Sequence, residues 1–314
     1  MLNEILWEFT LKCNKNCKYC GSKNNLNKEE DIYRIHIAKE ISYMKPREVT
    51  FTGGEPSLLL DELSKCADIL NKKEIKCKVL TNGNLFKQKL DDEFDKKFEC
   101  YGYSVNELND IENAMTNLLN IPRDKTTIIT NFGLHNIDHF DKIAKFAVLF
   151  PCWQIQLTMG NEFQLDIDDI EKLLQKIQDL PKNFIQVIRA DNLNCNKCSA
   201  GISSCSITWN GDVIPCLSYR AWKNDLMIQG NLFNTSLKKI WKNKFNFFRE
   251  RKFVPCCKNI SGIKEILQKE DAMFNPTYTD VIAVYGVKIP TDIQLDLTPI
   301  VYGVANTGDY ISIK

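Results

Sequence analysis

The sequence has no apolar run long enough to cross a membrane and no strong excess of charge of either sign. A bilayer span needs about 18–20 consecutive apolar residues, and the chain of 314 residues contains no such run. Its 41 basic and 40 acidic residues leave a formal net charge of +1. Nucleic-acid-binding and membrane-surface proteins carry a basic footprint. We therefore expect neither nucleic acid nor a membrane as a partner.

A secretory leader is also missing from the first residues. Glu4 and Glu8 interrupt the apolar stretch at 1–12, and no basic residues precede it. The segment is therefore typical of a strand and not of a signal peptide. We expect the protein to be cytoplasmic.

Thirteen cysteines stand out against these absences. A disulfide framework is disfavoured, because the number is odd, no export signal is present and a chain of this size folds without cross-links. Most of the cysteines fall into two clusters, one near the start and one at 195–257. Clustered thiols indicate metal, with iron–sulfur clusters or zinc as the candidates.

Strand-like and helix-like segments alternate through the first half of the chain. Strands are predicted at 4–11, 48–52, 76–81, 101–105, 126–130 and 153–158. Helices are predicted at 28–44, 58–71, 85–95 and 166–180, and the strands at 101–105 and 126–130 are each followed by a further helical stretch. Six strand–helix units predict an α/β fold with a parallel sheet at 1–182, which is either a partial (β/α)6 barrel, our interpretation of this domain, or an open doubly wound sheet. In such barrels the chemistry lies at the carboxyl ends of the strands.

Three cysteines follow the first predicted strand with the spacing Cys13-x3-Cys17-x2-Cys20. Three thiolates can hold three irons of one cubane cluster and leave the fourth iron open. An open coordination position distinguishes a catalytic metal centre from a structural one. A zinc knuckle whose fourth ligand lies elsewhere in the chain is the alternative.

Together with Gly53-Gly54-Glu55-Pro56 after the second strand, this motif resembles the radical S-adenosylmethionine (SAM) superfamily. The resemblance implies a catalytic [4Fe–4S] cluster on the three cysteines, with SAM chelating the open iron. It further implies that the reduced cluster cleaves SAM to a 5′-deoxyadenosyl radical, which abstracts a hydrogen atom from the substrate. A flavodoxin or ferredoxin-type reductant is the implied partner.

The same resemblance implies which residues contact SAM. Tyr19 occupies the aromatic position that packs near the adenine, and Glu55 lies near the SAM ammonium. Gly53 and Gly54 leave room for the backbone to approach the methionine group. The ends of the third, fourth and fifth strands add Asn82, Ser104 and Asn131. For Ser104 and Asn131, ordinary capping of a strand end is the alternative.

The second cysteine cluster resembles the SPASM/twitch auxiliary-cluster domain. Cys-Ser-Ala-Gly at 198–201 and Gly-x4-Cys at 211–216 match its opening, and Asn-Gly at 210–211 signals a hairpin turn. The full pattern continues with several spaced cysteines, whereas this chain offers only an adjacent pair. The resemblance therefore implies one auxiliary [4Fe–4S] cluster in a domain at 183–260, and a zinc-stapled hairpin is the alternative. Its candidate ligands are Cys198, Cys216, Cys256, Cys257, Cys195 and Cys205.

The remaining cysteines lie inside predicted elements. Cys66 falls in a helix, and the others begin strands at Cys77, Cys100 and Cys152. Because free cysteine packs as a small hydrophobe, we expect all four in the core.

In the superfamily that the chain resembles, an auxiliary-cluster domain usually accompanies modification of peptides or proteins. We therefore expect a peptide or protein substrate that is cross-linked, epimerised or oxidised. The cluster motif begins at Cys13, so we expect no peptide-recognition domain before the barrel. The alternatives are a radical SAM dehydrogenase for a small molecule, a non-enzymatic iron–sulfur electron carrier and a zinc-structured binding module.

The tail at 261–314 differs from the rest of the chain. It contains a predicted short helix and then two copies of Val-Tyr-Gly-Val, at 284–287 and 301–304. Aromatic and β-branched repeats favour strands. We expect the tail to add edge strands or to close the barrel, and a fused substrate or substrate mimic is the alternative.

Overall fold

The computed structural model describes residues 1–20, 33–158, 162–163, 165–178, 185–189, 199–217, 227–250 and 310–312. The strands are β1 (Glu4–Thr10), β2 (Glu48–Gly53), β3 (Lys76–Thr81), β4 (Cys100–Ser104), β5 (Thr126–Phe132), β6 (Cys152–Leu157), β7 (Ile185–Arg189), β8 (Ser204–Ile207), β9 (Asp212–Ile214), β10 (Gly230–Asn231) and β11 (Tyr310–Ser312). The α-helices are α1 (Arg34–Met44), α2 (Leu60–Asn71), α3 (Asp92–Asp95), α4 (Leu108–Thr116), α5 (Phe140–Ala147), α6 (Ile167–Gln178), α8 (Leu237–Lys244) and α9 (Asn246–Arg249).

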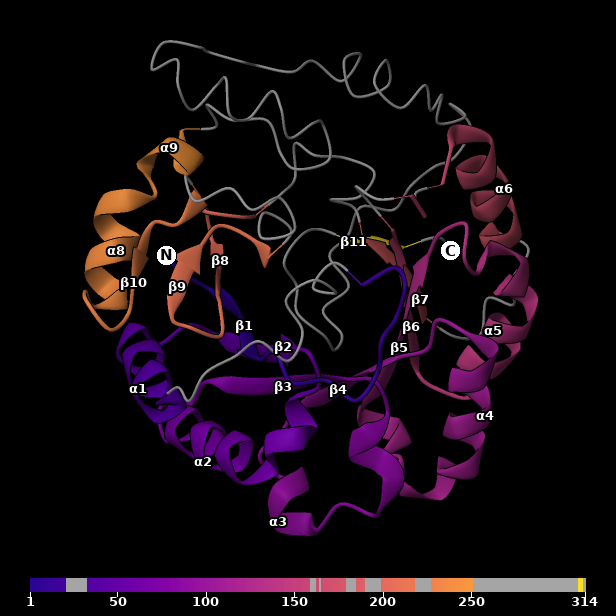
Figure 1. Cartoon of the computed structure of the whole chain (residues 1–314), viewed down its shortest axis with the longest axis horizontal. Helices are drawn as coiled ribbons and strands as arrows, with labels where there is room; N and C mark the ends of the chain where they lie inside the picture. Colours follow the sequence, from indigo (N-terminus) through magenta and orange to yellow (C-terminus); the bar gives the residue numbers. More distant parts are fainter. Residues whose placement is uncertain are drawn as a thin grey trace.

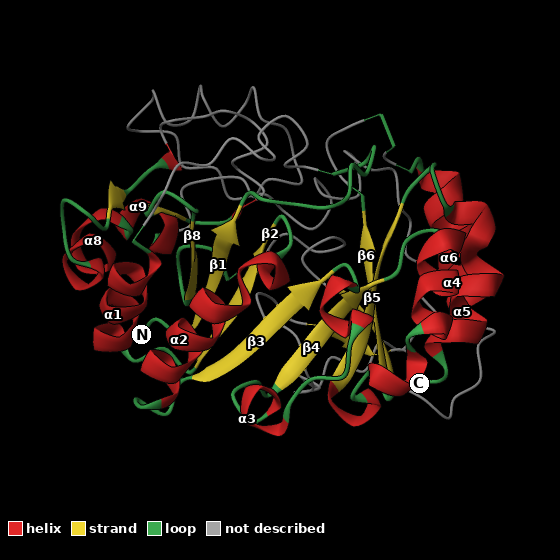
Figure 2. Ribbon diagram, turned by 60° about the horizontal axis from the view of Figure 1, so that its bottom comes forward, coloured by secondary structure: helices red, strands yellow, loops and turns green. Residues whose placement is uncertain are grey.

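One sheet runs through these elements in the order β10-β9-β8-β1-β2-β3-β4-β5-β6-β7-β11. Strands β1 to β7 are parallel to one another. The sheet curves, and the helices follow its outer side (Figures 1 and 2). The predicted partial barrel of parallel strands is confirmed. Strand β7, which the sequence analysis assigns to the second domain, continues the barrel sheet.

The outer side of the sheet carries the main hydrophobic core. Side chains alternate between the two faces of a strand, so Trp7 and Phe9 of β1 point to the same side. Their rings meet edge to face with centroids 5.1 Å apart, and Phe51 of β2 lies 5.4 Å from each. Arg34 of α1 donates a hydrogen bond to the Phe9 carbonyl at 2.7 Å. This contact fixes α1 against the sheet.

The inner side of the sheet is mostly polar. It holds a small apolar cluster of Leu80, Cys100 and Ile129, separate from the main core. The Lys78 ammonium and the Glu48 carboxylate form an ion pair at 2.9 Å, with both side chains less than 8% exposed. The remaining inner positions of the strands include Glu8, Thr52, Ser104, Asn131, Gln154 and Gln156. The barrel therefore encloses hydrogen-bonding groups on its concave side.

The predicted helix at 85–95 is wrong. The chain forms a 3-10 turn at Asn84–Lys87, becomes extended at Gln88, and starts again as α3. The Asp91 carboxylate accepts a hydrogen bond from the Phe94 backbone N–H at 2.7 Å. Aspartate at this position favours the start of a new helix over continuation of the preceding one.

A hairpin from the second half of the chain joins the sheet beside β1. Strand β8 is parallel to β1 with Ile5 opposite Cys205, and β9 returns antiparallel to β8. On the far edge, β11 pairs antiparallel with β7, so the tail contributes an edge strand. The two Val-Tyr-Gly-Val repeats lie outside the described residues. Among the described residues, no helix is long and apolar enough to cross a membrane.

Candidate functional site

The three cysteines of the first motif lie on one loop at the carboxyl end of β1. Cys13, Cys17 and Cys20 are all partly exposed. The Cys20 backbone N–H donates to the Cys17 carbonyl at 3.2 Å, which forms a tight turn. Burial raises the pKa of the Cys13 thiol. Because metals bind thiolates, loading this site must release protons.

The two glycines after β2 pack against the start of this cysteine loop. The Gly54 N–H donates to the Thr10 carbonyl and the Glu55 N–H donates to the Lys12 carbonyl, both at 2.7 Å. A Cβ atom on Gly53 would lie 2.1 Å from the Thr10 oxygen, and one on Gly54 would lie 2.2 Å from the Lys12 oxygen. Gly53 also has a φ of +126°, a conformation that favours glycine. The glycines therefore allow β2 to hold the cysteine loop by its backbone.

Glu55 links this loop to the neighbouring strand. Its carboxylate is fully buried and accepts hydrogen bonds from the Ser57 N–H, the Thr81 hydroxyl and the Asn82 N–H, at 3.1, 3.0 and 2.7 Å. Burial raises the pKa of Glu55, while these hydrogen bonds act in the opposite direction. Glu55 thus ties the end of β2 to the end of β3.

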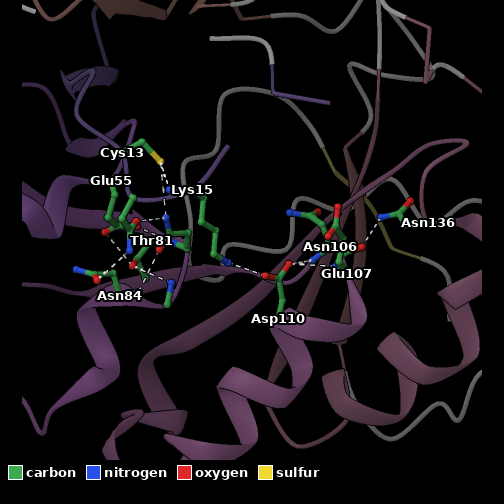
Figure 3. A network of polar contacts seen from close by, with 12 residues as sticks. Cys13, Lys15, Glu55, Thr81, Asn84, Asn106, Glu107, Asp110 and Asn136 are labelled. Carbon is green, nitrogen blue, oxygen red and sulfur yellow. Dashed lines mark hydrogen bonds and ion pairs between the residues drawn. The ribbon is translucent and has the colours of Figure 1, made fainter. Parts of the chain in front are cut away.

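Asn82 extends the connection back to the cysteine loop. Its side-chain amide donates to Asn14 Oδ1 at 2.9 Å and lies 3.9 Å from the Cys13 sulfur. Asn14 in turn donates to Asn84 Oδ1 at 3.0 Å. Figure 3 shows part of this network beside Cys13. The structure therefore brings the predicted residues Cys13, Glu55 and Asn82 together.

Comparisons with known proteins agree with this arrangement. The family model described as "Radical SAM superfamily" matches residues 7–126, and the SPASM model, described as "Iron-sulfur cluster-binding domain", matches 195–259. The chain contains a radical SAM domain. Its cofactors are [4Fe–4S] clusters and SAM.

Relatives of this radical SAM protein include an uncharacterised protein of Methanocaldococcus jannaschii, MJ0907. It is 26% identical over 217 residues, which cover 57% of this chain and 73% of that protein. Among solved structures, Streptococcus suis SuiB bound to SAM has a TM-score of 0.63 at 14% identity, covering 88% of this chain and 76% of SuiB. The protein anSMEcpe, with bound SAM and a Cp18Cys peptide, has a TM-score of 0.59 at 18% identity, covering 90% and 96%. These structures share the fold.

The cysteine loop of this radical SAM protein fits an iron–sulfur cluster in the type and number of its donors. Three thiols stand on one partly exposed loop, and thiolates are the ligands that such clusters require. Among the described residues, no three His, Cys, Asp or Glu side chains are already gathered as a metal site.

A second polar network lies across the carboxyl ends of β4 and β5. The Lys15 ammonium of the cysteine loop pairs with the Asp110 carboxylate of α4 at 2.6 Å. Asp110 also accepts hydrogen bonds from the Asn106 and Glu107 N–H groups, at 2.9 and 3.1 Å. Figure 3 shows that the Lys15–Asp110 pair connects the two networks. The sequence patterns do not predict this pair. Glu107 and Asp110 have the spacing of a capping box, but no local signal marks Lys15.

Ser104 and Asn131 occupy the expected strand ends and are both half-buried. Ser104 lies opposite Ile129, and Asn131 lies opposite Gln156. The Asn131 N–H donates to Asn106 Oδ1 at 2.7 Å. Their contact with SAM stays a prediction, as do the contacts of the other predicted positions.

The candidate ligands of the auxiliary cluster have different surroundings. Cys216 is partly exposed and follows β9 towards the amino end of β1. Cys205 lies on β8 inside the main hydrophobic core, and its side chain is only 1% exposed. That position favours a packing role over a ligand role. The other four candidates, at 195, 198, 256 and 257, lie outside the described residues.

The expectation for the remaining cysteines is confirmed. Cys66 and Cys77 pack in the main core, whereas Cys100 belongs to the small inner cluster. Cys152, at the start of β6, is 4% exposed. Burial raises the pKa of the Cys66 and Cys152 thiols to about 12, so both are inert thiols at neutral pH.

Proposed function

We propose that this radical SAM protein is an enzyme that modifies a peptide or protein with a 5′-deoxyadenosyl radical. The observation that carries the proposal is the attachment of the cysteine loop to the Gly53–Gly54–Glu55 segment, at the carboxyl end of the barrel. When bound, the reduced cluster and SAM supply the radical chemistry. Gly53 and Gly54 have no side chain, so the backbone of this segment contacts the cysteine loop directly and holds it. Cys13, Cys17 and Cys20 provide the thiolates.

The polar inner side of the sheet supports a peptide as the substrate class. Asn131 and Gln156 are partly exposed on this side and present amide groups, which match the N–H and C=O groups of a peptide. Glu8 is 1% exposed and has a structural role there, because its carboxylate accepts from the Trp209 N–H of the β8–β9 turn at 3.3 Å. The anSMEcpe structure, which has the same fold, contains a peptide. Cross-linking, epimerisation and oxidation are the candidate reactions.

A flavodoxin or ferredoxin-type protein is the proposed reductant. Lys12 and Lys18 are exposed on either side of Cys17, and positive charge at this place favours an acidic partner. The proposal keeps the cytoplasmic location expected from the sequence.

Anaerobic reconstitution tests the enzymatic part of the proposal. Protein loaded with iron and sulfide is incubated with SAM and dithionite, and 5′-deoxyadenosine is measured. We expect the natural protein to form 5′-deoxyadenosine. The control Cys66→Ala, which removes a thiol in α2, should form it as well, whereas Cys17→Ala should form none. Iron-loaded protein that forms none would indicate an electron carrier. Protein that retains zinc but no iron would indicate a binding module.

Mass spectrometry tests the substrate class. Peptides encoded beside the gene are incubated with the loaded protein and SAM, and their masses are compared with those after incubation with Cys17→Ala. A change of mass only with the natural sequence supports peptide modification. Modification of a small molecule instead, with all peptides unchanged, would replace this substrate class with the dehydrogenase alternative.

A further inference from the structure

The loop after β5 places an imidazole directly on the cysteine loop. The ring of His135 stacks on the ring of Tyr19, with centroids 4.0 Å apart and planes 17° from parallel. The ring of Phe163, from the segment after β6, meets His135 edge-on at 5.5 Å and 82°. Asn136 holds the turn that carries His135, because its Oδ1 accepts from the Gly133 N–H at 2.9 Å. The imidazole, which belongs to the loop after β5, is thus held by a ring of the cysteine loop and a ring of the segment after β6.

Among the residues that the structure describes, this imidazole and a neighbouring hydroxyl have no hydrogen-bond partner. Both ring nitrogens of His135 and the Thr158 hydroxyl are buried and unpartnered. A Cβ atom on Gly133 would lie 2.9 Å from His135 Nδ1 and 2.9 Å from Thr158 Oγ1, so the two groups lie close to each other beside Gly133. Buried polar groups are almost always hydrogen-bonded. Three orphaned atoms at one place therefore point to a ligand.

His135 lies at a cavity of suitable size for a nucleoside. Its volume is about 740 Å³, and it is lined by the cysteine loop, by the start of α4 and by His135, His139 and Phe163. Small-molecule sites in proteins have volumes of about 300–1,000 Å³. Cys17 and Tyr19 line the same cavity, so a ligand here lies beside the cysteine loop.

The chemistry of these groups selects the kind of base. Burial lowers the pKa of His135 to about 4, so the imidazole is neutral at physiological pH. A neutral imidazole offers one donor and one acceptor. Adenine presents an amino donor beside a ring-nitrogen acceptor. Because the two imidazole nitrogens point in different directions, one of them would accept from the adenine amino group while the Thr158 hydroxyl donates to the ring nitrogen. Hypoxanthine has a carbonyl in place of that amino group and cannot donate the first of these hydrogen bonds.

We propose that His135, together with Thr158, recognises the edge of the adenine of SAM in this protein. The assignment rests on the proposed use of SAM and adds side chains that the sequence motifs do not contain. His135 acts as a binding residue, and its stack on Tyr19 orients the imidazole towards the base.

Calorimetry on the reconstituted protein tests the assignment by binding, independently of turnover. The ligands are S-adenosylhomocysteine and its hypoxanthine counterpart, S-inosylhomocysteine. His135→Phe keeps a ring on Tyr19 and removes both nitrogens, and Thr158→Val removes the hydroxyl. We expect His135→Phe to weaken the adenine ligand about tenfold, the effect of one lost hydrogen bond, and to leave the hypoxanthine ligand nearly unchanged. Thr158→Val should reduce the same discrimination by a smaller factor.

The matched control is His36→Phe, which replaces another stacked histidine, on Phe233, away from the cavity. It should bind both ligands as the natural sequence does. A second readout is the electron paramagnetic resonance spectrum of the reduced cluster, whose change on SAM addition should need about tenfold more SAM in His135→Phe.

Two results would overturn the assignment. Either His135→Phe binds the adenine ligand as tightly as the natural sequence, or it loses affinity for both ligands equally, which would indicate a packing role. A natural protein that itself binds neither SAM nor S-adenosylhomocysteine would overturn the proposed function, and this assignment with it. The two failures are therefore distinguishable.

Discussion

Replacing Gly54 with alanine tests whether the glycine segment holds the cysteine loop. The added Cβ atom would lie 2.2 Å from the Lys12 carbonyl oxygen, and Cβ atoms are essentially never found within 3.0 Å of another heavy atom. The two backbone segments must therefore separate by roughly 0.8 Å. Both 2.7 Å hydrogen bonds between them, from Gly54 and Glu55, cross this contact.

The expected cost follows from these two effects. Overpacking costs about 1–3 kcal/mol, and each weakened backbone hydrogen bond contributes about 0.5–1.5 kcal/mol. We expect Gly54→Ala to lower the free energy of unfolding by about 2–6 kcal/mol, measured by urea unfolding followed by tryptophan fluorescence. The iron bound after reconstitution should fall as well, because the loop that carries the thiols is displaced.

Gly230→Ala is the matched control for this substitution. Its Cβ atom would meet only the Ile240 side chain, at 2.9 Å, and that side chain can turn aside. We expect a smaller loss of stability than in Gly54→Ala and no loss of iron at the cysteine loop. If Gly54→Ala unfolds at the same urea concentration as the natural sequence and binds the same iron, the role assigned to the glycines is wrong.

Three further predictions concern the clusters, an ion pair and an imidazole. The reconstituted natural protein should hold about eight irons. When alanine replaces Cys13, Cys17 and Cys20 together, about four irons should remain and SAM should not be cleaved. About twelve irons in the natural protein would contradict a single auxiliary cluster. Asp110→Asn should lower the free energy of unfolding by about 1–2 kcal/mol, because it weakens a helix cap and an ion pair. The control Glu99→Gln, in an exposed ion pair, should change it by less than about 0.5 kcal/mol. Equal effects of the two substitutions in urea unfolding would contradict a specific role for Asp110. Because burial lowers the pKa of His135 from 6.5 to about 4, the unfolded chain binds the extra proton between these values and stability falls as the pH falls through that window. His135→Phe should lose less stability between pH 6.5 and 4 than the natural sequence does, and an identical pH profile would contradict this linkage.

The sequence predicted the strands well because their apolar runs are short and regularly spaced. It also located the cysteine loop and the glycine segment, because each of these motifs consists of residues that are close together in the sequence. The helix at 85–95 failed because the Asp91 cap breaks a segment that has the composition of a helix.

Contacts between distant segments could not be predicted in this way. The pairing of β8 with β1 joins residues about 200 positions apart, and it decides that Cys205 faces the core. The Lys15–Asp110 pair and the His135–Tyr19 stack also arise only when the barrel brings loops together. His135 carries no signal in a chain that has three histidines.

The pairing of β8 with β1 also places the cysteine loop and Cys216 at opposite ends of β1. The cysteine loop leaves the carboxyl end of β1, whereas Cys216 follows β9 towards the amino end of the same strand. From Glu4 to Thr10 the strand rises by roughly 20 Å, at about 3.3 Å per residue. Since a continuous ladder of backbone hydrogen bonds joins the hairpin to this strand, the hairpin cannot slide along it without breaking the ladder. Strand β1 therefore keeps the cysteine loop and Cys216 at a fixed distance along the strand.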